Sequence, residues 1–464
     1  MLEPDVNVQR KMIVSNPATE QPLAVVEAWG ADEVNAAVRL SKRAYPEWSK
    51  VSPSDRALLL RRLANLVTDN LEALARMETD NVGKPISDSR DEVAMVAEVF
   101  NFYAGAIDKF RGDTIPVAGG IDMTFNEPLG VVGAIVPWNF PIAITSWKVG
   151  PALACGNSII VKPAELTPLS AVKLADLALD AGIPPGVFQV VPGHGQVAGS
   201  ALVAHEDVAK IAFTGSSEVG RSIMAKASKT LKRVTLELGG KSSNIIFEDA
   251  DLDKAASAAP MAVFGNAGQD CCARSRILIQ RSIYDDFVDL LVAASAAIEV
   301  GDPLDEDTQM GPLISSDHLD RVKGFIDPLG ESLEVIYQGA SPGGPGHWFA
   351  PMLVSTSDPT NRVFQEEIFG PIACLIAFDD EEDAVRLANE TCYGLSGSIW
   401  TRDGARALRM ARSVASGNLS INSNSSVRVA TPFGGMKQSG FGRELGLEAL
   451  LSYSDVKNVF YSTS

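Results

Sequence analysis

The sequence predicts an α/β protein of two or three domains, one of them built on a parallel, doubly wound sheet. From Ser158 to Leu238, short β-rich segments alternate with helical segments, an order typical of parallel strands joined by crossover helices. The chain has 464 residues, which is too long for one ordinary hydrophobic core. Such sheets bind ligands at the carboxyl ends of their strands, so we expect functional side chains directly after those strands.

The N-terminal third is predicted to be mostly helical, and a strand-rich segment follows it. Leucines recur at helical spacing from Leu59 to Leu74, behind the helix-start signal SPSD at 52–55. Between Gly112 and Val136, the stretches TIPV, IDMTF and GVVGAIV are short, β-rich and separated by Gly and Pro. Within this segment NEPLG, at 126–130, predicts a hairpin.

The alternating region gives the parallel sheet its predicted elements. Strands are expected at 158–162, 187–191, 209–213 and 233–238, with helices at 169–182, 197–205 and 217–228. A second α/β block begins near Gly239. It should contain a helix at about 283–298, a Gly/Pro loop at 341–346, a strand at 371–378 and a last strand in the tail, 454–464.

Composition argues against several partners. The net charge is −18, from 40 basic and 58 acidic residues, so no nucleic-acid partner is expected. The charged, proline-containing N-terminus predicts no secretory signal, and the most apolar stretch, 130–147, is interrupted by Asn139 and two prolines, so no membrane span is expected. The five cysteines are scattered without a CxxC pair, which predicts no metal site, no disulfide framework and a cytoplasmic location.

Two strand ends carry residues suited to a nucleotide. In FTGSSEVG, at 213–220, Gly215 permits a tight turn and Ser216 or Ser217 can cap the next helix, whose free N–H groups would face an anion. In VKPAELTP, at 161–168, Glu165 could accept hydrogen bonds from ribose hydroxyls and repel a 2′-phosphate. The alternative for Lys162 and Glu165 is a plain surface ion pair, and both interpretations stay open.

Three further motifs carry groups suited to covalent catalysis. Glu237 lies between leucines in TLELGGKS, where burial would raise its pKa toward that of a general base; the alternative is an ion pair with Lys241. Asn139 lies on the rigid turn PWNFP and could donate to an oxyanion or simply cap the turn. NAGQDCCARSR, at 266–276, offers adjacent cysteines as candidate nucleophiles.

The joint order of PWNFP, KPAE, FTGSSEVG, ELGGKS, GQDCCA, EEIFGP and PFGGMKQSGFGRELG resembles the NAD(P)-dependent aldehyde dehydrogenase superfamily, from about Pro17 to Val459. The family's GQxCxA pattern implies that Cys271 is the nucleophile and Cys272 a neighbour. The resemblance implies further roles: Glu237 and Asn139 as general base and oxyanion donor; Trp138, Lys162, Glu165, Gly215, Ser216, Gly220, Glu367 and Phe369 as cofactor contacts; Phe140, Trp147, Asp270, Arg428 and Phe433 as substrate contacts.

The resemblance also implies the organisation of the chain and its chemistry. We expect an aldehyde dehydrogenase-like fold: a Rossmann-like NAD-binding domain at 1–111 and 131–238, an α/β catalytic domain at 239–437, and a β oligomerisation element at 112–130 and 453–464. The implied reaction is oxidation of an aldehyde to its acid through a thiohemiacetal and a thioester on cysteine, with NAD as cofactor and NADP as the alternative. A homodimer or homotetramer is expected. The alternatives are a coenzyme A-acylating enzyme, which usually lacks the basic glutamate, and a non-catalytic relative.

Two charged residues point to different aldehydes. Asp270 precedes the nucleophile, where its charge should raise the thiol pKa, and a cationic substrate would explain its presence. The GQDC spelling is similar to that of bacterial γ-aminobutyraldehyde dehydrogenases. The alternative is that Asp270 turns away and accepts backbone hydrogen bonds. Arg428 favours instead a carboxylate-bearing semialdehyde, because this loop borders the family's substrate tunnel. We expect an ω-aminoaldehyde, since Asp270 adjoins the nucleophile.

Overall fold

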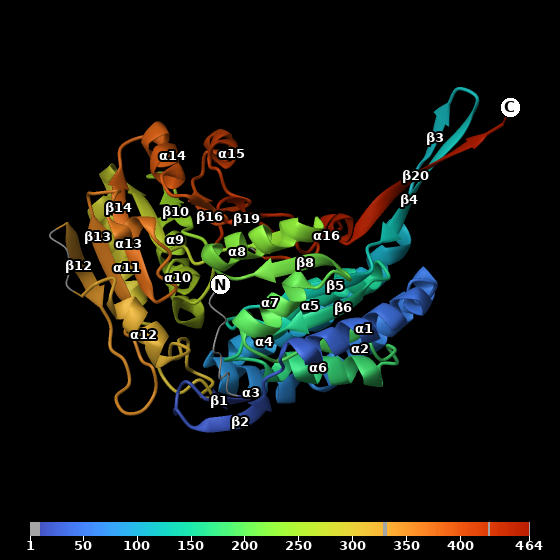
Figure 1. Cartoon of the computed structure of the whole chain (residues 1–464). Helices are drawn as coiled ribbons and strands as arrows, with labels where there is room; N and C mark the ends of the chain where they lie inside the picture. Colours follow the sequence, from blue (N-terminus) through green and yellow to red (C-terminus); the bar gives the residue numbers. More distant parts are fainter. Residues whose placement is uncertain (1–9, 328–331, 426, 464) are drawn as a thin grey trace.

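The computed structural model describes residues 10–327, 332–425 and 427–463. Two large, mostly parallel sheets lie side by side, and a small antiparallel sheet projects from one end (Figure 1). The predicted α/β class is therefore confirmed, and so is the predicted mostly helical N-terminal third. The helices of that third are α1 (Ala31–Trp48), α2 (Pro53–Asp69), α3 (Leu71–Val82) and α4 (Ile86–Ala106), and β1 (Lys11–Ser15) and β2 (Pro22–Glu27) precede them.

The first large sheet has the strand order β19-β9-β8-β5-β6-β7, and every pairing is parallel except that of β19. Its strands are β5 (Val131–Ile135), β6 (Ser158–Lys162), β7 (Phe188–Val190), β8 (Val208–Thr214), β9 (Arg233–Glu237) and β19 (Gly440–Phe441). The crossover segments are α5 (Pro141–Ala154), α6 (Leu169–Asp180), η2 (Gly195–Gly199), α7 (Ser200–Ala204) and α8 (Ser217–Ala227), with the short turn η3 (Ser228–Thr230) after them. The predicted alternation is thus observed.

Strand β6 shows why the strands of this sheet appear in the sequence as continuous apolar segments. All five of its residues are buried because helices cover both faces. Ile159 and Val161 join the core beneath α2, α4, α5 and α6, whereas Ile160 joins the core beneath α1, α7 and α8. The alternation follows from the two-residue period of a strand.

The second large sheet has the order β12-β13-β14-β11-β10-β16-β17, and only β12 runs antiparallel. Its strands are β10 (Ser243–Ile246), β11 (Arg276–Gln280), β12 (Leu333–Gln338), β13 (Met352–Thr356), β14 (Ile372–Phe378), β16 (Ser396–Trp400) and β17 (Asn418–Ile421). The associated helices are α9 (Leu252–Ala258), α10 (Met261–Phe264), η4 (Gly265–Gly268), η5 (Arg281–Ile283), α11 (Tyr284–Ala296), α12 (Ser316–Lys323), α13 (Arg362–Gln365), α14 (Glu381–Asn389) and α15 (Gly404–Ser413). Strands β15 (Tyr393–Gly394) and β18 (Met436–Lys437) pair separately.

The small sheet has the order β20-β4-β3 and carries the C-terminus away from the body (Figure 1). Its strands are β3 (Thr114–Val117), β4 (Gly120–Pro128) and β20 (Ser454–Ser462); η1 (Ile107–Lys109) and α16 (Glu448–Ser452) precede β3 and β20. The strand in the C-terminal tail was predicted, but the prediction of a hairpin at 126–130 was wrong. The turn lies between Val117 and Gly120, where Gly119 has a φ of 80°, and 126–130 instead leads from the small sheet into β5.

The two large sheets meet through opposite edges. Asn139, Lys162 and Ser216 follow or end strands of the first sheet, whereas Cys271 and Glu367 precede strands of the second. Cavities lined from both sides join the carboxyl edge of the first sheet to the amino edge of the second. Among the described helices, none is both long and apolar enough to span a bilayer.

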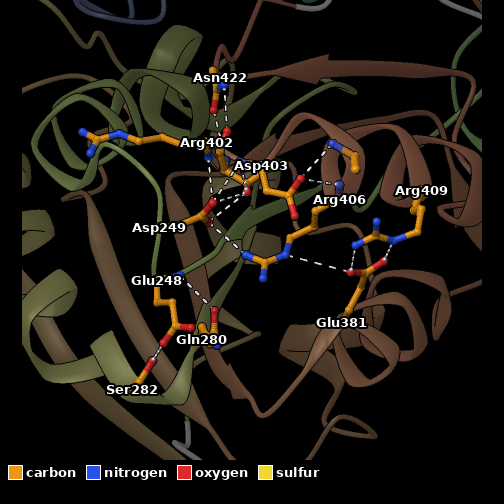
Figure 2. A network of polar contacts seen from close by, with 12 residues as sticks. Glu248, Asp249, Gln280, Ser282, Glu381, Arg402, Asp403, Arg406, Arg409 and Asn422 are labelled. Atoms are coloured by element: carbon orange, nitrogen blue, oxygen red, sulfur yellow. Dashed lines mark hydrogen bonds and ion pairs between the residues drawn. The ribbon is translucent and has the colours of Figure 1, made fainter.

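The carboxyl edge of the second sheet is closed by a polar network (Figure 2). The Asp249 carboxylate, after β10, accepts hydrogen bonds from the hydroxyl of Thr401 at 2.8 Å, the backbone N–H of Asp403 at 2.9 Å and the guanidinium of Arg406 at 3.0 Å. Glu381 of α14 pairs with Arg409 of α15 at 2.8 Å. These groups contact one another, whereas the candidate site residues Cys271 and Glu367 precede strands at the opposite, amino edge of this sheet.

Candidate active site

The loop before Cys271 has an unusual backbone. Asn266, Ala267 and Gly268 have φ values of 49°, 55° and 72°, so three successive residues adopt the left-handed region. This region is costly for a residue with a side chain, and such strain persists where surrounding contacts enforce it. Position 268 requires glycine for a second reason, because a Cβ there would lie 2.2 Å from the carbonyl oxygen of Gly370.

Buried hydrogen bonds hold this strained loop. The Asn266 amide donates to the backbone oxygen of Asn139 at 3.1 Å. The Gln269 side chain donates to the backbone oxygen of Asn266 at 3.0 Å and accepts from the backbone N–H of Ile314 at 2.9 Å. The Asn139 amide in turn donates to the backbone oxygen of Gln269 at 2.9 Å. The loop is therefore fixed to the turn that carries Asn139, and Cys271 is presented from a rigid support.

The two adjacent cysteines occupy different positions. Cys271 lines two cavities, one also lined by Trp138 and the other by Trp147, whereas Cys272 lines only the second. Interaction with the Cys272 side chain, together with burial and the charge of Asp270, raises the pKa of the Cys271 thiol well above its usual value. The isolated thiol is therefore neutral at physiological pH and needs a proton acceptor to become a strong nucleophile.

Glu237 is a buried carboxyl group at the end of β9. Its side chain is 4% exposed, lines both cavities, and neither carboxyl oxygen has a hydrogen-bond partner among the described residues. Burial, and then the charge of Glu444, raise its pKa well above the usual value, while Lys148 opposes this. Glu444 and Lys148 form a buried ion pair at 2.8 Å.

The alternative pairing of Glu237 with Lys241 is not observed. The Lys241 ammonium is buried without a hydrogen-bond partner among the described residues, and burial lowers its pKa to about 7. The intervening glycines allow close approaches. A Cβ at Gly239 would lie 2.3 Å from a Glu367 carboxylate oxygen, and one at Gly240 would lie 2.2 Å from the Cys271 carbonyl oxygen.

The first cavity, of about 370 Å³, brings together many of the predicted cofactor residues. Trp138 packs edge-on against Phe369, with ring centroids 5.3 Å apart, and Glu367 accepts a hydrogen bond from the N–H of Gly240 at 2.8 Å. Burial raises the pKa of Glu367 to about 7. The lining includes Trp138, Asn139, Gly215, Ser216, Glu218, Glu237, Cys271, His318, Arg321, Glu367 and Phe369.

A second hollow of about 290 Å³ continues this groove, and Glu218 lines both parts. Lys162 and Glu165 form an ion pair at 3.2 Å beside it, and Glu165 accepts a hydrogen bond from the N–H of Gly195, which lines the hollow. Both interpretations of this pair from the sequence are therefore compatible with the structure, because the residues pair with each other and also border the groove.

The turn into α8 fits an anion at the middle of the groove. The N–H of Gly215 donates to the backbone oxygen of Glu237 at 3.0 Å, and Ser216 caps the helix by accepting from the N–H of Val219. The first turn of a helix leaves backbone N–H groups without intrahelical partners, and Gly215, Ser216 and Glu218 at this turn line the groove. Gly220 has a packing role, because a Cβ there would lie 2.7 Å from Leu238. The two hollows together offer aromatic side chains at one end and a helix N-terminus at the middle, which are the kinds of group that a dinucleotide with a central pyrophosphate requires.

The other cavity at Cys271, of about 310 Å³, holds most of the predicted substrate residues. Trp147 and Phe433 pack edge-on with centroids 5.3 Å apart, and Phe140 and Asp270 complete the wall near the cysteines. Asp270 accepts a hydrogen bond from the N–H of Cys272 at 2.8 Å, so the predicted alternative is also present, although the residue still lines the cavity. Arg428 is exposed and does not belong to the described lining.

Several residues that line these cavities were not predicted from the sequence. Asp88, Asp91 and Glu92 of α4 line the substrate cavity, and their i, i+3, i+4 spacing in the sequence would have placed them on one helix face. His318 and Arg321 of α12 line the cofactor cavity. The His318 ring nitrogen lies 2.7 Å from the Phe369 carbonyl oxygen, and burial lowers its pKa to about 4. A lone histidine in a short helix gives no sequence signal for this.

A thiol, a buried carboxyl group and an amide donor lie together around one end of the groove, an arrangement that suits an enzyme working through a covalent thiol adduct. Comparison with known proteins agrees. The aldehyde dehydrogenase family model matches residues 5–459, and the chain belongs to that family. It is an NAD(P)-dependent aldehyde dehydrogenase.

Individual relatives cover the chain almost completely. An aldehyde dehydrogenase from Aspergillus niger is 42% identical over 450 residues, which are 96% of this chain and 90% of that protein. Betaine aldehyde dehydrogenase from Bacillus subtilis is 38% identical over 469 residues, which are 99% of this chain and 96% of that protein. The NAD⁺ complex of an aldehyde dehydrogenase from Bacillus cereus superposes with a TM-score of 0.96 at 39% identity, covering 98% and 94% of the two chains.

Proposed function

We propose that this chain oxidises ω-aminoaldehydes to ω-amino acids with NAD, using Cys271 as nucleophile, Asn139 as oxyanion donor and Glu237 as general base. The observation that carries the substrate class is the acidic lining of the cavity that leads to Cys271. Asp88, Asp91, Glu92 and Asp270 all belong to it, and no Lys or Arg does among the described lining residues.

The proposed reaction assigns each group one task. The Cys271 thiol first gives its proton to solvent water, and the thiolate sulfur then adds to the carbonyl carbon while the Asn139 amide and the backbone N–H of Cys271 stabilise the oxyanion. When bound, NAD supplies the hydride acceptor for the oxidation. The resulting thioester on Cys271 is then hydrolysed by a water molecule whose proton passes to Glu237. Burial without a hydrogen-bond partner supports this role, because it raises the pKa of Glu237 and so makes its carboxylate a stronger proton acceptor.

The acidic residues differ in how free they are to bind a cation. Glu92 is already paired with the buried ammonium of Lys84. Asp88, by contrast, has no hydrogen bond or ion pair within the described parts of the chain, and burial raises its pKa to about 6. A carboxylate that is partly desolvated and unpaired is stabilised by an incoming ammonium group. A carboxylate-bearing semialdehyde would be repelled by the same lining, and Arg428 lies outside it.

A relative supports this charge preference. The Bacillus subtilis protein that is 38% identical over nearly the whole chain is named for betaine aldehyde, which carries a quaternary ammonium group. That comparison supports a cationic aldehyde. The carboxylates of Asp88 and Asp270 favour a primary amine, because they accept hydrogen bonds and a quaternary ammonium group has no N–H to donate.

A kinetic panel tests the proposal. We expect 4-aminobutyraldehyde to exceed butyraldehyde and succinate semialdehyde in kcat/KM. Asp88→Asn should reduce its kcat/KM about tenfold, because one charge pair at about 4 Å contributes roughly 1–4 kcal/mol. Butyraldehyde should be little affected. Glu98→Gln, an exposed position on the same helix, is the matched control.

The pH dependence of the same panel gives a second readout. Protonation of Asp88 below about pH 6 should shrink the advantage of the aminoaldehyde, whereas its ammonium stays charged throughout. Betaine aldehyde as the best substrate would move the choice to a quaternary amine. If succinate semialdehyde is the best substrate and Arg428→Ala removes its lead, the proposal is wrong.

We also propose that copies of the chain assemble as a homodimer or homotetramer. The exposed apolar side chains of the projecting sheet support this: Val456, Phe460 and Tyr461 of β20 are 65%, 51% and 62% exposed. In this proposal 112–130 and 453–464 serve assembly, 1–111 and 131–238 hold the cofactor, and 239–437 supplies the nucleophile. The free cysteines support a cytoplasmic location, which fractionation of the source cells would test.

A further inference from the structure

The inner end of the substrate cavity contains a compact set of metal-binding atoms. A carboxylate oxygen of Asp270 and the sulfurs of Cys271 and Cys272 all lie within 4.8 Å of one another. All three residues line the same cavity. The proposed reaction uses only one of the two sulfurs, and Cys272 has no task in it.

We propose that Asp270, Cys271 and Cys272 bind a thiophilic divalent metal ion, of the Zn²⁺ or Cd²⁺ type, and that this ion inhibits the enzyme by occupying the place of the aldehyde. Two thiolates and one carboxylate, with water in the fourth position, form a tetrahedral set that Zn²⁺ accepts. Binding releases one proton from each thiol and changes no oxidation state.

The required rearrangement is small. Zinc–sulfur bonds of about 2.3 Å at a tetrahedral centre place two sulfurs roughly 3.8 Å apart. The present spread of up to 4.8 Å therefore needs a contraction of about 1 Å, within reach of side-chain rotation. One oxygen of Asp270 already accepts the N–H of Cys272 at 2.8 Å, which orients the carboxylate and leaves its second oxygen for the ion.

The surroundings favour a cation and tolerate the bound complex. Asp88 and Asp91 line the same cavity, so a divalent ion is attracted along the path proposed for the ammonium substrate. Two thiolates, a carboxylate and a divalent ion together carry one negative charge. Arg274 is fully buried and donates to the Cys272 carbonyl oxygen at 2.5 Å, and its charge offsets that excess.

The inference shares the acidic cavity with the proposed function but uses no aldehyde, so a titration of the enzyme with Cd²⁺ alone tests it separately. We expect one tight Cd²⁺ per chain, with an ultraviolet thiolate-to-metal absorption of two thiolates and a release of two protons. Cys272→Ser should halve that absorption. Removing either Cys272 or the Asp270 carboxylate (Asp270→Asn) should weaken binding at least tenfold. Cys392→Ala, which removes the exposed thiol, is the matched control and should bind as the parent does.

Zn²⁺ inhibition provides the link to the cavity. Inhibition should be competitive with the aldehyde, be reversed by EDTA, and protect Cys271 from alkylation by iodoacetamide. Unchanged Cd²⁺ binding in both Cys272→Ser and Asp270→Asn, with circular dichroism showing both folded, would overturn the inference. So would loss of the tight site in Cys392→Ala. Failure of 4-aminobutyraldehyde in the kinetic panel would leave these binding results unaffected and would refute only the substrate class.

Discussion

Glu165 should control the choice between NAD and NADP, and Glu165→Gln should shift that choice toward NADP. Glu165 and Lys162 form an ion pair at 3.2 Å beside the hollow that continues the cofactor groove. In the parent enzyme, the lysine attracts a 2′-phosphate and the glutamate repels it, so the two effects partly cancel. Without the Glu165 charge, the Lys162 ammonium is left uncompensated.

The expected size follows from the exposure of the pair. The Glu165 side chain is 35% exposed, so the water-like end of the Coulomb range applies, about 1 kcal/mol per pair of unit charges at 4 Å. A phosphate monoester carries nearly two charges at neutral pH, which gives about 2 kcal/mol. Since 1.4 kcal/mol corresponds to tenfold, the ratio of kcat/KM for NADP to that for NAD should rise roughly 30-fold.

Steady-state kinetics with both cofactors at fixed aldehyde measures this ratio. Lys162→Met is the matched partner variant and should lower the ratio, because only the repulsive carboxylate remains. High salt should reduce both effects, since the pair is partly solvated. An unchanged ratio in Glu165→Gln, with NAD kinetics intact, would show that this pair lies outside the reach of a 2′-phosphate.

Two further predictions concern hydrolysis and assembly. Glu237→Gln should lower steady-state turnover by about 10² or more while a rapid initial burst of NADH survives, since only thioester hydrolysis loses its base; stopped-flow absorbance measures this, and equal loss of burst and turnover would contradict the assignment. Light scattering at micromolar protein should give a dimer or tetramer mass, and deletion of 454–464, which removes β20, should lower it; a monomer for the full chain would refute assembly.

The sequence predicted those elements whose patterns are local. The strand 158–162 was found with its observed bounds because burial on both faces makes it a continuous apolar run between clear turns. The helix start at Pro53 was found because Ser52 caps it, accepting the N–H of Asp55. The hairpin was misplaced because NEPLG contains a proline and a glycine, as a turn does. Pairing of β4 along its whole length with β20, a partner more than 300 residues away, decides where that strand ends.

The site was predictable in part for the same reason. Short motifs carry Cys271, Glu237 and Asn139, and their order along the chain identifies the family. The acidic helix face at Asp88 and the histidine at 318 lie outside those motifs, and only the packing of α4 and α12 against the cavities brings them in. Their contribution depends on long-range contacts, which local sequence patterns do not encode.

In the proposed mechanism, the meeting of two sheets at opposite edges divides the reacting groups between the two halves of the molecule. The first sheet carries Asn139 and Glu237 but no thiol at the reaction centre, while the segment before the second sheet carries Cys271 without a base. A fragment ending near residue 238 would keep only the first-sheet side of the cofactor cavity, because His318, Glu367 and Phe369 line it from the other half. Its complement would hold the Cys271 thiol without Glu237. The proposed catalysis therefore requires groups from both halves. Restored turnover on mixing two such fragments would report that they reassemble with these groups in place.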